Sequence, residues 1–248
     1  MHVSHSSRDD KKSSFKHEST SMSIEFSVVI NRDCFRERLL KYTRRAYHML
    51  PELHTPYILD VGCGSGVSTL ELAKLSDGNI IGIDINQTLL KNLNRKIGEQ
   101  GLSHRVKTVH SPLLEMGRPD EGFDIIWAEG SLRIIGFETS LKKCRQLLKS
   151  NGFLVVHDDT QTLSANRKNL QSYGYKLTAF FLLPEDAWWV DYYRPLEIRI
   201  KRLYAKHQNN SEALKVLDRY QNEVDTVKGN LKEYSSAFYI LQEYAPTH

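Results

Sequence analysis

The stretch ILDVGCGSGVSTLELAKL, residues 58–75, decides the fold, because an apolar run passes through a glycine-rich turn into an amphipathic run. The turn contains Gly62, Gly64 and Gly66. A turn of this kind places backbone N–H groups at a helix N-terminus, where a ligand can approach closely. Position 67 is valine, whereas a dinucleotide fingerprint needs a third glycine there, and the turn lacks the lysine of a P-loop. We expect a ligand other than a dinucleotide or a nucleoside triphosphate.

Strand-like and helix-like runs alternate around this turn, which is typical of a parallel sheet covered by helices. The strands are expected at 57–61, 79–84, 105–110, 123–128, 152–158, 176–183 and 235–244. Helical patterns fill about fifty residues between the last two of them, and another helical pattern precedes the sheet at 32–50. The sequence predicts an α/β fold with a doubly wound, mostly parallel, seven-stranded sheet and an antiparallel last strand. It also predicts an N-terminal helix and a helical cap inserted between the last two strands.

Composition limits the classes of function. Hydrophobic content of 40% and aromatic content of 10% are ordinary for a globular protein, and no apolar run reaches the ~18 residues of a membrane span. The net charge is only +4 and the basic residues are scattered, so neither a nucleic-acid nor a membrane partner is expected. Three cysteines without metal-ligand spacing, and no apolar signal core after Met1, predict a cytoplasmic protein without a metal site.

Domain boundaries follow from the same patterns. Residues 1–23 are rich in Ser, Lys and His, and we expect a disordered tail there. Residues 24–248 are expected to form one domain, with a ligand-binding core at 56–160 and the cap at 184–232.

Two aspartates indicate the ligand. Asp60 ends the first predicted strand, and Asp84 ends the second, twenty residues beyond Gly64. A carboxylate at the second position can accept hydrogen bonds from both hydroxyls of a ribose, so the pattern favours a nucleoside.

DVGCGSG (60–66) followed by GIDIN (82–86) resembles the cofactor site of class I S-adenosylmethionine-dependent methyltransferases, over roughly residues 56–160. The resemblance implies a Rossmann-like fold in which Asp60 and the turn hold the methionine end of S-adenosylmethionine and Asp84 holds its ribose. This chain departs from the family pattern at Ser111, where the family usually has an aspartate for the adenine. The residues that we assign to the cofactor are Asp60, Gly62, Cys63, Gly64, Gly66, Asp84, Ile85, Asn86, Ser111, Pro112 and Glu129.

Acceptor residues are expected just after the fourth and fifth strands, where ligands bind to open α/β sheets. Methyl transfer mainly requires alignment and exclusion of water, so a base is optional. His157 is the first candidate base and Glu129 the second, with a structural role for His157 equally compatible with its position. The predicted substrate contacts are Trp127, Phe137, Trp188, Trp189, Tyr192 and Tyr193. Helical spacing puts Trp188 with Tyr192 and Trp189 with Tyr193. These four residues could form an aromatic cage, although at least two of them could simply anchor the cap.

The segments 127–138 and 183–197 together resemble a narrower group of prokaryotic class I methyltransferases that act on small molecules. We therefore predict a methyltransferase for a small-molecule acceptor, acting as a monomer or homodimer, with the pocket closed by the N-terminal helix and the cap. Two alternatives stay open: a catalytically silent protein that keeps the cofactor fold, and a relative of the aminopropyl transferases.

Overall fold

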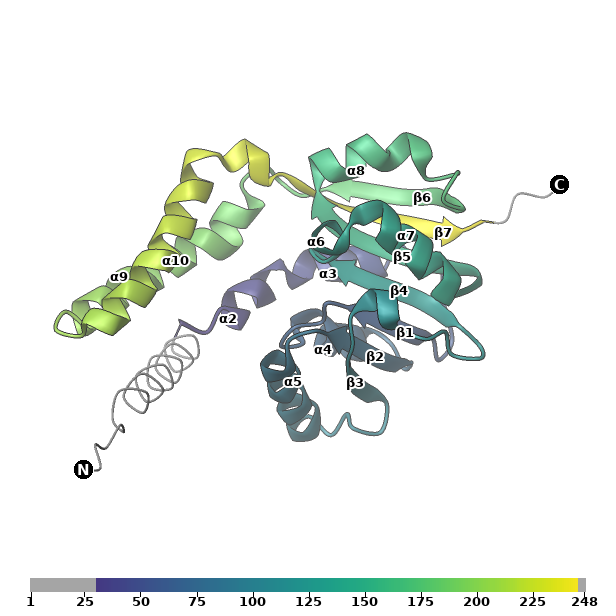
Figure 1. The fold of residues 1–248 in the computed structure, drawn as a ribbon, viewed down its shortest axis with the longest axis horizontal. Helices are drawn as coiled ribbons and strands as arrows, with labels where there is room; N and C mark the ends of the chain where they lie inside the picture. Colours follow the sequence, from purple (N-terminus) through teal and green to yellow (C-terminus); the bar gives the residue numbers. More distant parts are fainter. Residues whose placement is uncertain (1–29, 245–248) are drawn as a thin grey trace, which may run out of the picture. The chain divides into compact units, whose positions relative to one another are not determined.

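A seven-stranded sheet forms the centre of the computed structural model, which describes residues 30–244 (Figure 1). The strands lie in the order β3-β2-β1-β4-β5-β7-β6. Neighbours among β1 to β5 pair in parallel, and β7 is antiparallel to both β5 and β6. Their bounds are β1 Tyr57–Val61, β2 Asn79–Asp84, β3 Val106–His110, β4 Phe123–Glu129, β5 Leu148–Asp159, β6 Tyr175–Leu182 and β7 Ser236–Glu243. The predicted fold class is therefore confirmed, while the tail predicted at 1–23 lies outside the described residues.

Helices cover both faces of the sheet. Buried residues place three helices on one face: α3 (Leu40–Tyr47), α4 (Val67–Leu75) and α5 (Gln87–Glu99). The other face is covered by η2 (Leu113–Glu115), α6 (Leu132–Ile135), α7 (Phe137–Leu147) and α8 (Thr160–Asn166), the last followed by η3 (Arg167–Asn169). None of the helices within residues 30–244 combines the length and the apolar character that a membrane crossing requires.

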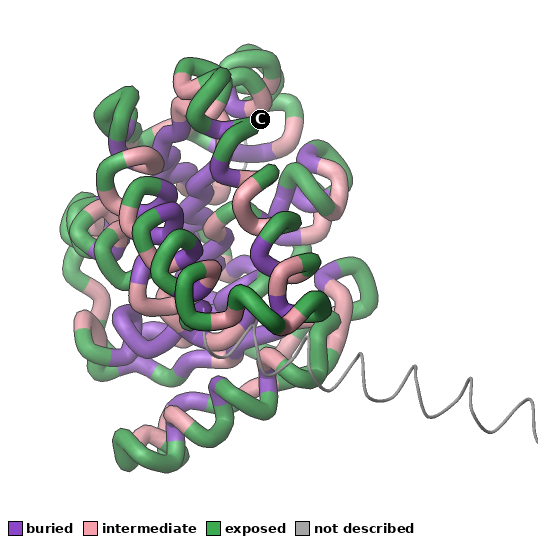
Figure 2. The backbone as a smooth tube through the Cα atoms, turned by 90° about the vertical axis from the view of Figure 1, so that its left-hand side faces the viewer, coloured by how far each residue is buried: buried purple, intermediate pink, exposed green. Residues whose placement is uncertain are grey.

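The central strands are apolar on both faces because they lie between these two helical layers. Along β4, Ile125 and Trp127 belong to the core on the α4 side, whereas Ile126 and Ala128 belong to the core on the α7 side. All four are at most 1% exposed. In Figure 2 the interior of the backbone tube is accordingly buried, and exposed positions lie mainly on the surrounding helices and loops.

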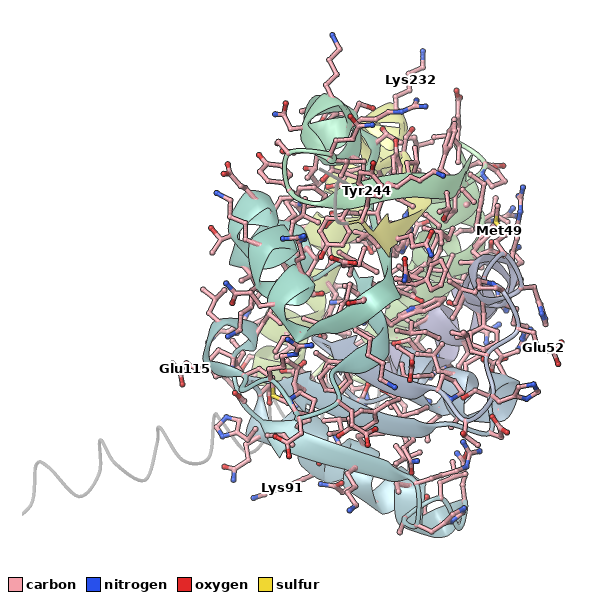
Figure 3. The ribbon with its side chains drawn as sticks, turned by 90° about the vertical axis from the view of Figure 1, so that its right-hand side faces the viewer. Met49, Glu52, Lys91, Glu115, Lys232 and Tyr244 are labelled. Atoms are coloured by element: carbon pink, nitrogen blue, oxygen red, sulfur yellow. The ribbon has the colours of Figure 1, made fainter. Side chains whose placement is uncertain are left out.

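The chain divides into two compact units. The sheet unit comprises Glu37–Ala187 and the chain from Lys232 onward, and it includes η5 (Leu231–Tyr234) only from its second residue. The cap unit comprises the segment up to Arg36 together with Trp188–Leu231. On the outer surface of the sheet unit, charged side chains such as Glu52, Lys91 and Glu115 point outward, as Figure 3 shows.

The predicted helix at 32–50 is not continuous, which corrects the expectation. It consists of α2 (Asp33–Arg36), a 3₁₀ turn η1 (Glu37–Leu39) and α3, and the boundary between the two units falls between α2 and η1. Short 3₁₀ stretches are common at the ends of α-helices and as connectors between them.

The cap unit is a helical hairpin with the N-terminal segment packed on it. It contains a π-helical turn, η4 (Trp189–Tyr193), followed by α9 (Arg194–Lys206) and α10 (Ser211–Gly229). Arg32 forms an ion pair with Glu223 of α10 at 2.7 Å, and its guanidinium lies over the rings of Tyr192 and Tyr220. A partly buried, bidentate arginine pair of this kind fixes one segment against another more firmly than a single, fully exposed ion pair.

Candidate functional site

The three glycines of the turn between β1 and α4 are required for two different reasons. All three have positive φ, 71° at Gly62, 54° at Gly64 and 88° at Gly66, a conformation that glycine adopts without steric cost. A Cβ at Gly62 would lie 2.7 Å from the Cβ of Ser131, and one at Gly66 would lie 2.1 Å from Leu93 Cδ1. At Gly64 the nearest atom would be 3.9 Å away. Gly62 and Gly66 therefore serve protein packing, whereas the space beside Gly64 is open to a ligand.

Backbone N–H groups of the turn are mostly used within the protein, contrary to the expectation that they are bare. The N–H groups of Gly62 and Cys63 donate to the carbonyl of Ile83, at 2.8 and 3.0 Å, and that of Gly66 donates to Cys63 O at 2.9 Å. These bonds tie the turn to the end of β2. The turn is thus a rigid platform whose open part is the surface at Gly64.

Asp84 is fixed beside that surface. Its Oδ2 accepts the N–H of Gly64 at 2.9 Å and its Oδ1 accepts the N–H of Asn86 at 2.7 Å. A carboxylate oxygen has two lone pairs, so each oxygen can accept a second hydrogen bond from a ligand hydroxyl. The next residue, Ile85, is 72% exposed. Asn86 itself caps α5, because its side-chain oxygen accepts the N–H groups of Thr88 and Leu89.

Asp60 is buried beneath the turn, with 1% of its surface exposed. Its Oδ2 accepts hydrogen bonds from Thr69 at 2.6 Å and Ser68 at 3.2 Å, both on α4. Burial, together with the charges of Glu129 and Asp84, raises the pKa of Asp60 to about 7, against the lowering effect of the hydrogen bonds from Thr69 and Ser68. Three carboxyl groups, from β1, β2 and β4, therefore interact electrostatically at one edge of the sheet. Such an edge favours a cationic ligand and disfavours a polyphosphate.

Cys63 is enclosed next to this acidic group. It is 4% exposed, and burial together with the nearby charges of Asp60 and Asp84 raises the pKa of its thiol. A neutral, buried thiol acts as a small apolar side chain rather than as a nucleophile.

At the end of β3, the side chain of Ser111 is already hydrogen-bonded within the protein. The hydroxyl of Ser111 donates to the carbonyl of Pro112 at 3.1 Å, and Pro112 precedes η2. A ring nitrogen of His110 lies 2.9 Å from the carbonyl of Ile85, which links the ends of β3 and β2.

Glu129 ends β4 and is held from two sides. Its Oε1 accepts the hydroxyl of Thr43 on α3 and the indole N–H of Trp127, both at 2.8 Å. Trp127 is 0% exposed and packs against Tyr47 and Phe238. In this structure it lies in the core and orients Glu129, and it presents no surface to a substrate.

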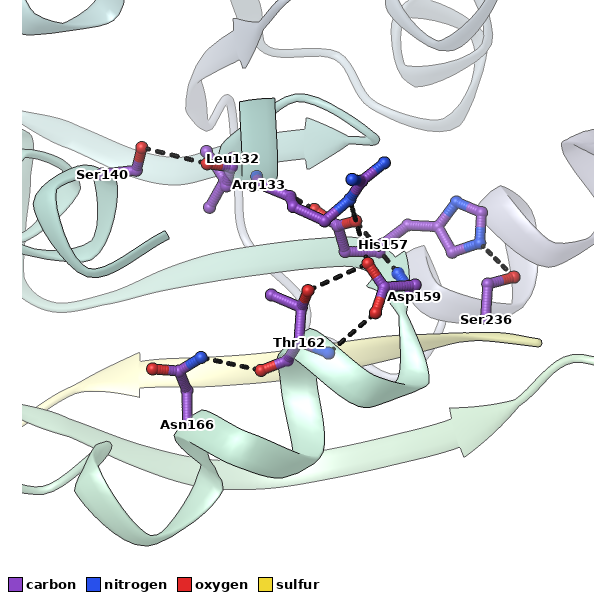
Figure 4. Close-up of polar contacts among 9 residues, drawn as sticks. Leu132, Arg133, Ser140, His157, Asp159, Thr162, Asn166 and Ser236 are labelled. Atoms are coloured by element: carbon purple, nitrogen blue, oxygen red, sulfur yellow. Dashed lines mark hydrogen bonds and ion pairs between the residues drawn. The ribbon is translucent and has the colours of Figure 1, made fainter. Parts of the chain in front are cut away.

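His157 lies beside Glu129 in the register of β4 and β5 and is also enclosed. It is 6% exposed, stacks on Phe238 with ring centroids 4.4 Å apart, and has a ring nitrogen 3.0 Å from the hydroxyl of Ser236 (Figure 4). These contacts support the structural role that the sequence left open.

Two aspartates after His157 bind the segment that follows β4. Asp158 accepts the backbone N–H of Arg133 at 3.1 Å, and Arg133 Nε lies 3.0 Å from Asp159 (Figure 4). Asp159 also caps α8 through Thr162. Burial raises the pKa of Asp158.

Phe137, predicted to contact the substrate, is 9% exposed at the start of α7 and packs in the core.

The four aromatic residues predicted for the acceptor belong to the cap unit. Trp188 lies 5.8 Å from Tyr192 and 6.3 Å from Tyr193, centroid to centroid. The second contact spans five residues, which is the spacing of a π-helical turn, whereas the predicted partner of Tyr193 was Trp189. Tyr192 and Tyr193 are 1% and 8% exposed, so they lie in the interior of the cap unit, and the ring centre of Trp189 lies 5.3 Å from Lys228 Nζ.

Sequence reasoning missed two residues that shape this edge, Thr43 and Arg133, and it placed Ser131 after the fourth strand without giving it a role. The hydroxyl of Ser131 donates to Val61 O at 2.8 Å and closes the turn at Gly62. No sequence signal indicates Thr43, because it is 86 positions from Glu129 and on another element.

Known proteins share this architecture and this turn. A family model described as a methyltransferase domain matches residues 58–152. A sterol 24-C-methyltransferase from Aspergillus fumigatus is 26% identical over 148 residues, covering 59% of this chain and 39% of that protein. The 27-O-demethylrifamycin SV methyltransferase of Amycolatopsis mediterranei is 25% identical over 155 residues, covering 60% of this chain and 57% of that protein.

Residues 58–152 of the chain are thus similar to the methyltransferase domain of S-adenosylmethionine-dependent methyltransferases. The chain spans less than two thirds of the length of these curated relatives. A solved methyltransferase from Thiobacillus denitrificans, in complex with S-adenosyl-L-homocysteine, matches with a TM-score of 0.65 at 18% identity, covering 81% of this chain and 90% of the other. The [4+2]-cyclase SpnF matches with a TM-score of 0.69 at 18% identity, covering 83% and 81%. The methyltransferase fold is thus shared with an enzyme named for other chemistry.

Proposed function

We propose that this protein transfers the methyl group of S-adenosylmethionine to a small-molecule acceptor. The observation that carries the proposal is the open surface at Gly64, bordered by the anchored carboxylate of Asp84 and the exposed side chain of Ile85. The hydroxyls of a ribose can donate hydrogen bonds to a carboxylate with free lone pairs, and an adenine ring can pack against an exposed aliphatic side chain.

Charge at this edge fits the same ligand. Asp60, Asp84 and Glu129 interact through their charges, and the ligand carries a sulfonium and an ammonium group. Opposite charges in a partly enclosed site attract each other more strongly than they do in water. A nucleoside triphosphate would instead be repelled.

Each residue of this edge has a separate proposed role. Asp84 would bind the ribose hydroxyls, Ile85 would cover one face of the adenine, and the turn at Gly64 would bear the methionine end. Asp60 holds the turn and α4 together through Thr69 and Ser68. The cofactor supplies an activated methyl group, and the protein aligns the acceptor and excludes water.

For the acceptor we propose a small organic molecule. The relatives are named for sterol and rifamycin substrates. Glu129 and His157 stay candidate bases, although both are bonded to neighbouring side chains in this structure. The oligomeric state, a monomer or a homodimer, and the cytoplasmic location also stay predictions.

Isothermal titration with S-adenosylmethionine tests the cofactor assignment. The wild type should bind, and Asp84→Ala should lose about 1–3 kcal/mol of binding free energy because the ribose loses its acceptor. Asp120→Ala, in an exposed loop before β4, serves as the control and should bind like the wild type. Absence of binding to the wild type would favour the catalytically silent alternative. Tighter binding of decarboxylated S-adenosylmethionine would favour aminopropyl transfer.

The acceptor is best sought with a labelled methyl donor and a metabolite extract. Label should appear in one or a few small organic products with the wild type and not with Asp84→Ala. Label appearing only in protein or nucleic acid would contradict the proposed acceptor class.

A further inference from the structure

A cavity lies at the end of the sheet opposite to the glycine turn. It has a volume of about 420 Å³ and is lined by residues of α7, the start of β5, the turn before β6 and the end of β7. The turn at Gly64 follows the carboxyl end of β1, whereas this cavity lies at the amino end of the parallel strand β5. Tyr244, which follows the lining residue Glu243, is labelled in Figure 3 on this side of the sheet.

Positive charge dominates the lining. Arg118, Lys142 and Arg145 contribute three cations, and Glu243 contributes one carboxylate. Glu243 is already engaged, because its Oε1 lies 3.3 Å from Arg145 and its Oε2 accepts the N–H of Asn151 at 3.1 Å. The lining therefore carries a net charge of +2. A phosphate group, with a charge of about −1.5 to −2, would neutralise it.

Arg145 is held in position rather than free in solvent. Gly174, with φ of 79°, lies so close to it that a Cβ there would be 2.0 Å from Arg145 Nε. The turn at Gly174 is itself fixed, because Tyr244 N–H donates to its carbonyl at 2.9 Å. A guanidinium fixed in this way loses little conformational entropy when it binds a phosphate with two hydrogen bonds.

Lys142 and Tyr173 complete one wall. Lys142 pairs with Glu138, outside the cavity, at 2.6 Å, and its ammonium lies 5.7 Å from the ring centre of Tyr173. Lys142 is 59% exposed, so its long side chain can turn from Glu138 to a ligand at small cost. The volume falls within the range of about 300–1,000 Å³ that small-molecule sites occupy.

We propose that this cavity binds a small molecule that carries a phosphate or pyrophosphate group, at a site separate from the cofactor site. The proposal does not depend on methyl transfer. The competing explanation is that these residues form only surface ion pairs near the end of α7, where cations are favourable for the helix dipole in any case.

Titration of the full chain with inorganic pyrophosphate at low ionic strength tests the proposal. The wild type should bind, and Lys142→Ala and Arg118→Ala should each weaken binding about tenfold through the loss of a charged hydrogen-bond donor. Lys143→Ala is the matched control, because Lys143 is the next cation on α7 and does not line the cavity; it should change affinity by less than about twofold. Glu243→Gln should tighten binding several-fold, because it removes the competing carboxylate.

The contradicting results are equally specific. No pyrophosphate binding by the wild type, an effect of Lys143→Ala equal to that of Lys142→Ala, or weaker binding by Glu243→Gln would each overturn the site. Tighter binding of citrate than of pyrophosphate would overturn the assignment to phosphate. Asp84→Ala should leave pyrophosphate affinity unchanged and Lys142→Ala should leave S-adenosylmethionine affinity unchanged, so the two proposals fail independently.

Discussion

The two halves of the carboxyl edge of the sheet differ in how much they offer to a ligand. On the half formed by β1 and β2, Gly64 is open, Asp84 has lone pairs to spare and Ile85 is 72% exposed. On the half formed by β4 and β5, Trp127 is fully buried and His157 is 6% exposed. The first half is open to a ligand, while the second is packed beneath α3 and beside β7.

This difference separates two kinds of residue that a sequence does not distinguish. Polar groups at strand ends become ligand contacts only where no other element covers them. Glu129 meets Thr43 of α3, and His157 meets Ser236 of β7, so both side chains are bonded within the protein. The following predictions test whether the packed half supports stability and the open half supports binding.

The largest effect is expected from Trp127→Ala in the packed half. Removing a fully buried tryptophan should cost about 3–5 kcal/mol of unfolding free energy because it leaves a cavity. Trp127→Phe keeps most of the volume and loses mainly the N–H bond to Glu129, so it should cost about 1 kcal/mol. Urea unfolding measures both. A loss below 1 kcal/mol in Trp127→Ala would contradict the core position of this side chain.

Gly66→Ala should be the next largest. A Cβ would collide with Leu93 at a residue whose φ is 88°, and we expect a loss of about 2–4 kcal/mol in stability. The matched control is Gly98→Ala in α5, where a Cβ meets nothing within 4 Å; it should be neutral or stabilise by up to about 1 kcal/mol. Equal stability of the two variants in urea unfolding would contradict the packing role of Gly66.

Asp60 should make stability depend on pH. Burial raises its pKa to about 7 from an ordinary value of 3.8, so the folded state holds the proton more tightly than the unfolded state. The resulting stabilisation is full below pH 3.8 and is lost as pH rises through about 7. Relative to Asp60→Asn, the wild type should therefore lose up to about 1.4 kcal/mol per pH unit between these values. Unfolding measured at several pH values checks this slope, and a difference that does not vary with pH would contradict it.

Ile85→Ser should give the smallest effect, confined to binding. The side chain is largely exposed, so stability should change by less than about 0.5 kcal/mol. Affinity for S-adenosylmethionine should fall by about 1 kcal/mol, or roughly fivefold, through lost apolar contact with the adenine. Ile134→Ser, at a position 78% exposed on α6, is the matched control. Equal losses of affinity in both variants, measured by titration, would contradict the assignment of Ile85 to the adenine.

Much of the fold follows from the sequence because its signals are local. The β1 and β2 ranges were predicted to the residue, since apolar runs end at glycine and aspartate, and the antiparallel last strand and the cap followed from the order of the patterns. The break of the predicted helix at 32–50 was not predictable, because the 3₁₀ turn at Glu37–Leu39 has no glycine or proline signal.

The site was predictable to the extent that it depends on the backbone. The turn at Gly62–Gly66 and the position of Asp84 follow from spacing along the chain. The burial of Trp127 and Phe137 did not follow, because it depends on α3, β7 and the packing of α7, which come from distant segments. Likewise, a π-helical turn moved the partner of Tyr193 from Trp189 to Trp188.

The most direct test of the central claim is a crystal structure of the protein soaked with S-adenosylhomocysteine. Both ribose hydroxyls should lie within hydrogen-bond distance of the Asp84 carboxylate, with the adenine against Ile85 and the amino-acid end over Gly64. A ligand bound elsewhere, or a ribose turned away from Asp84, would contradict that claim.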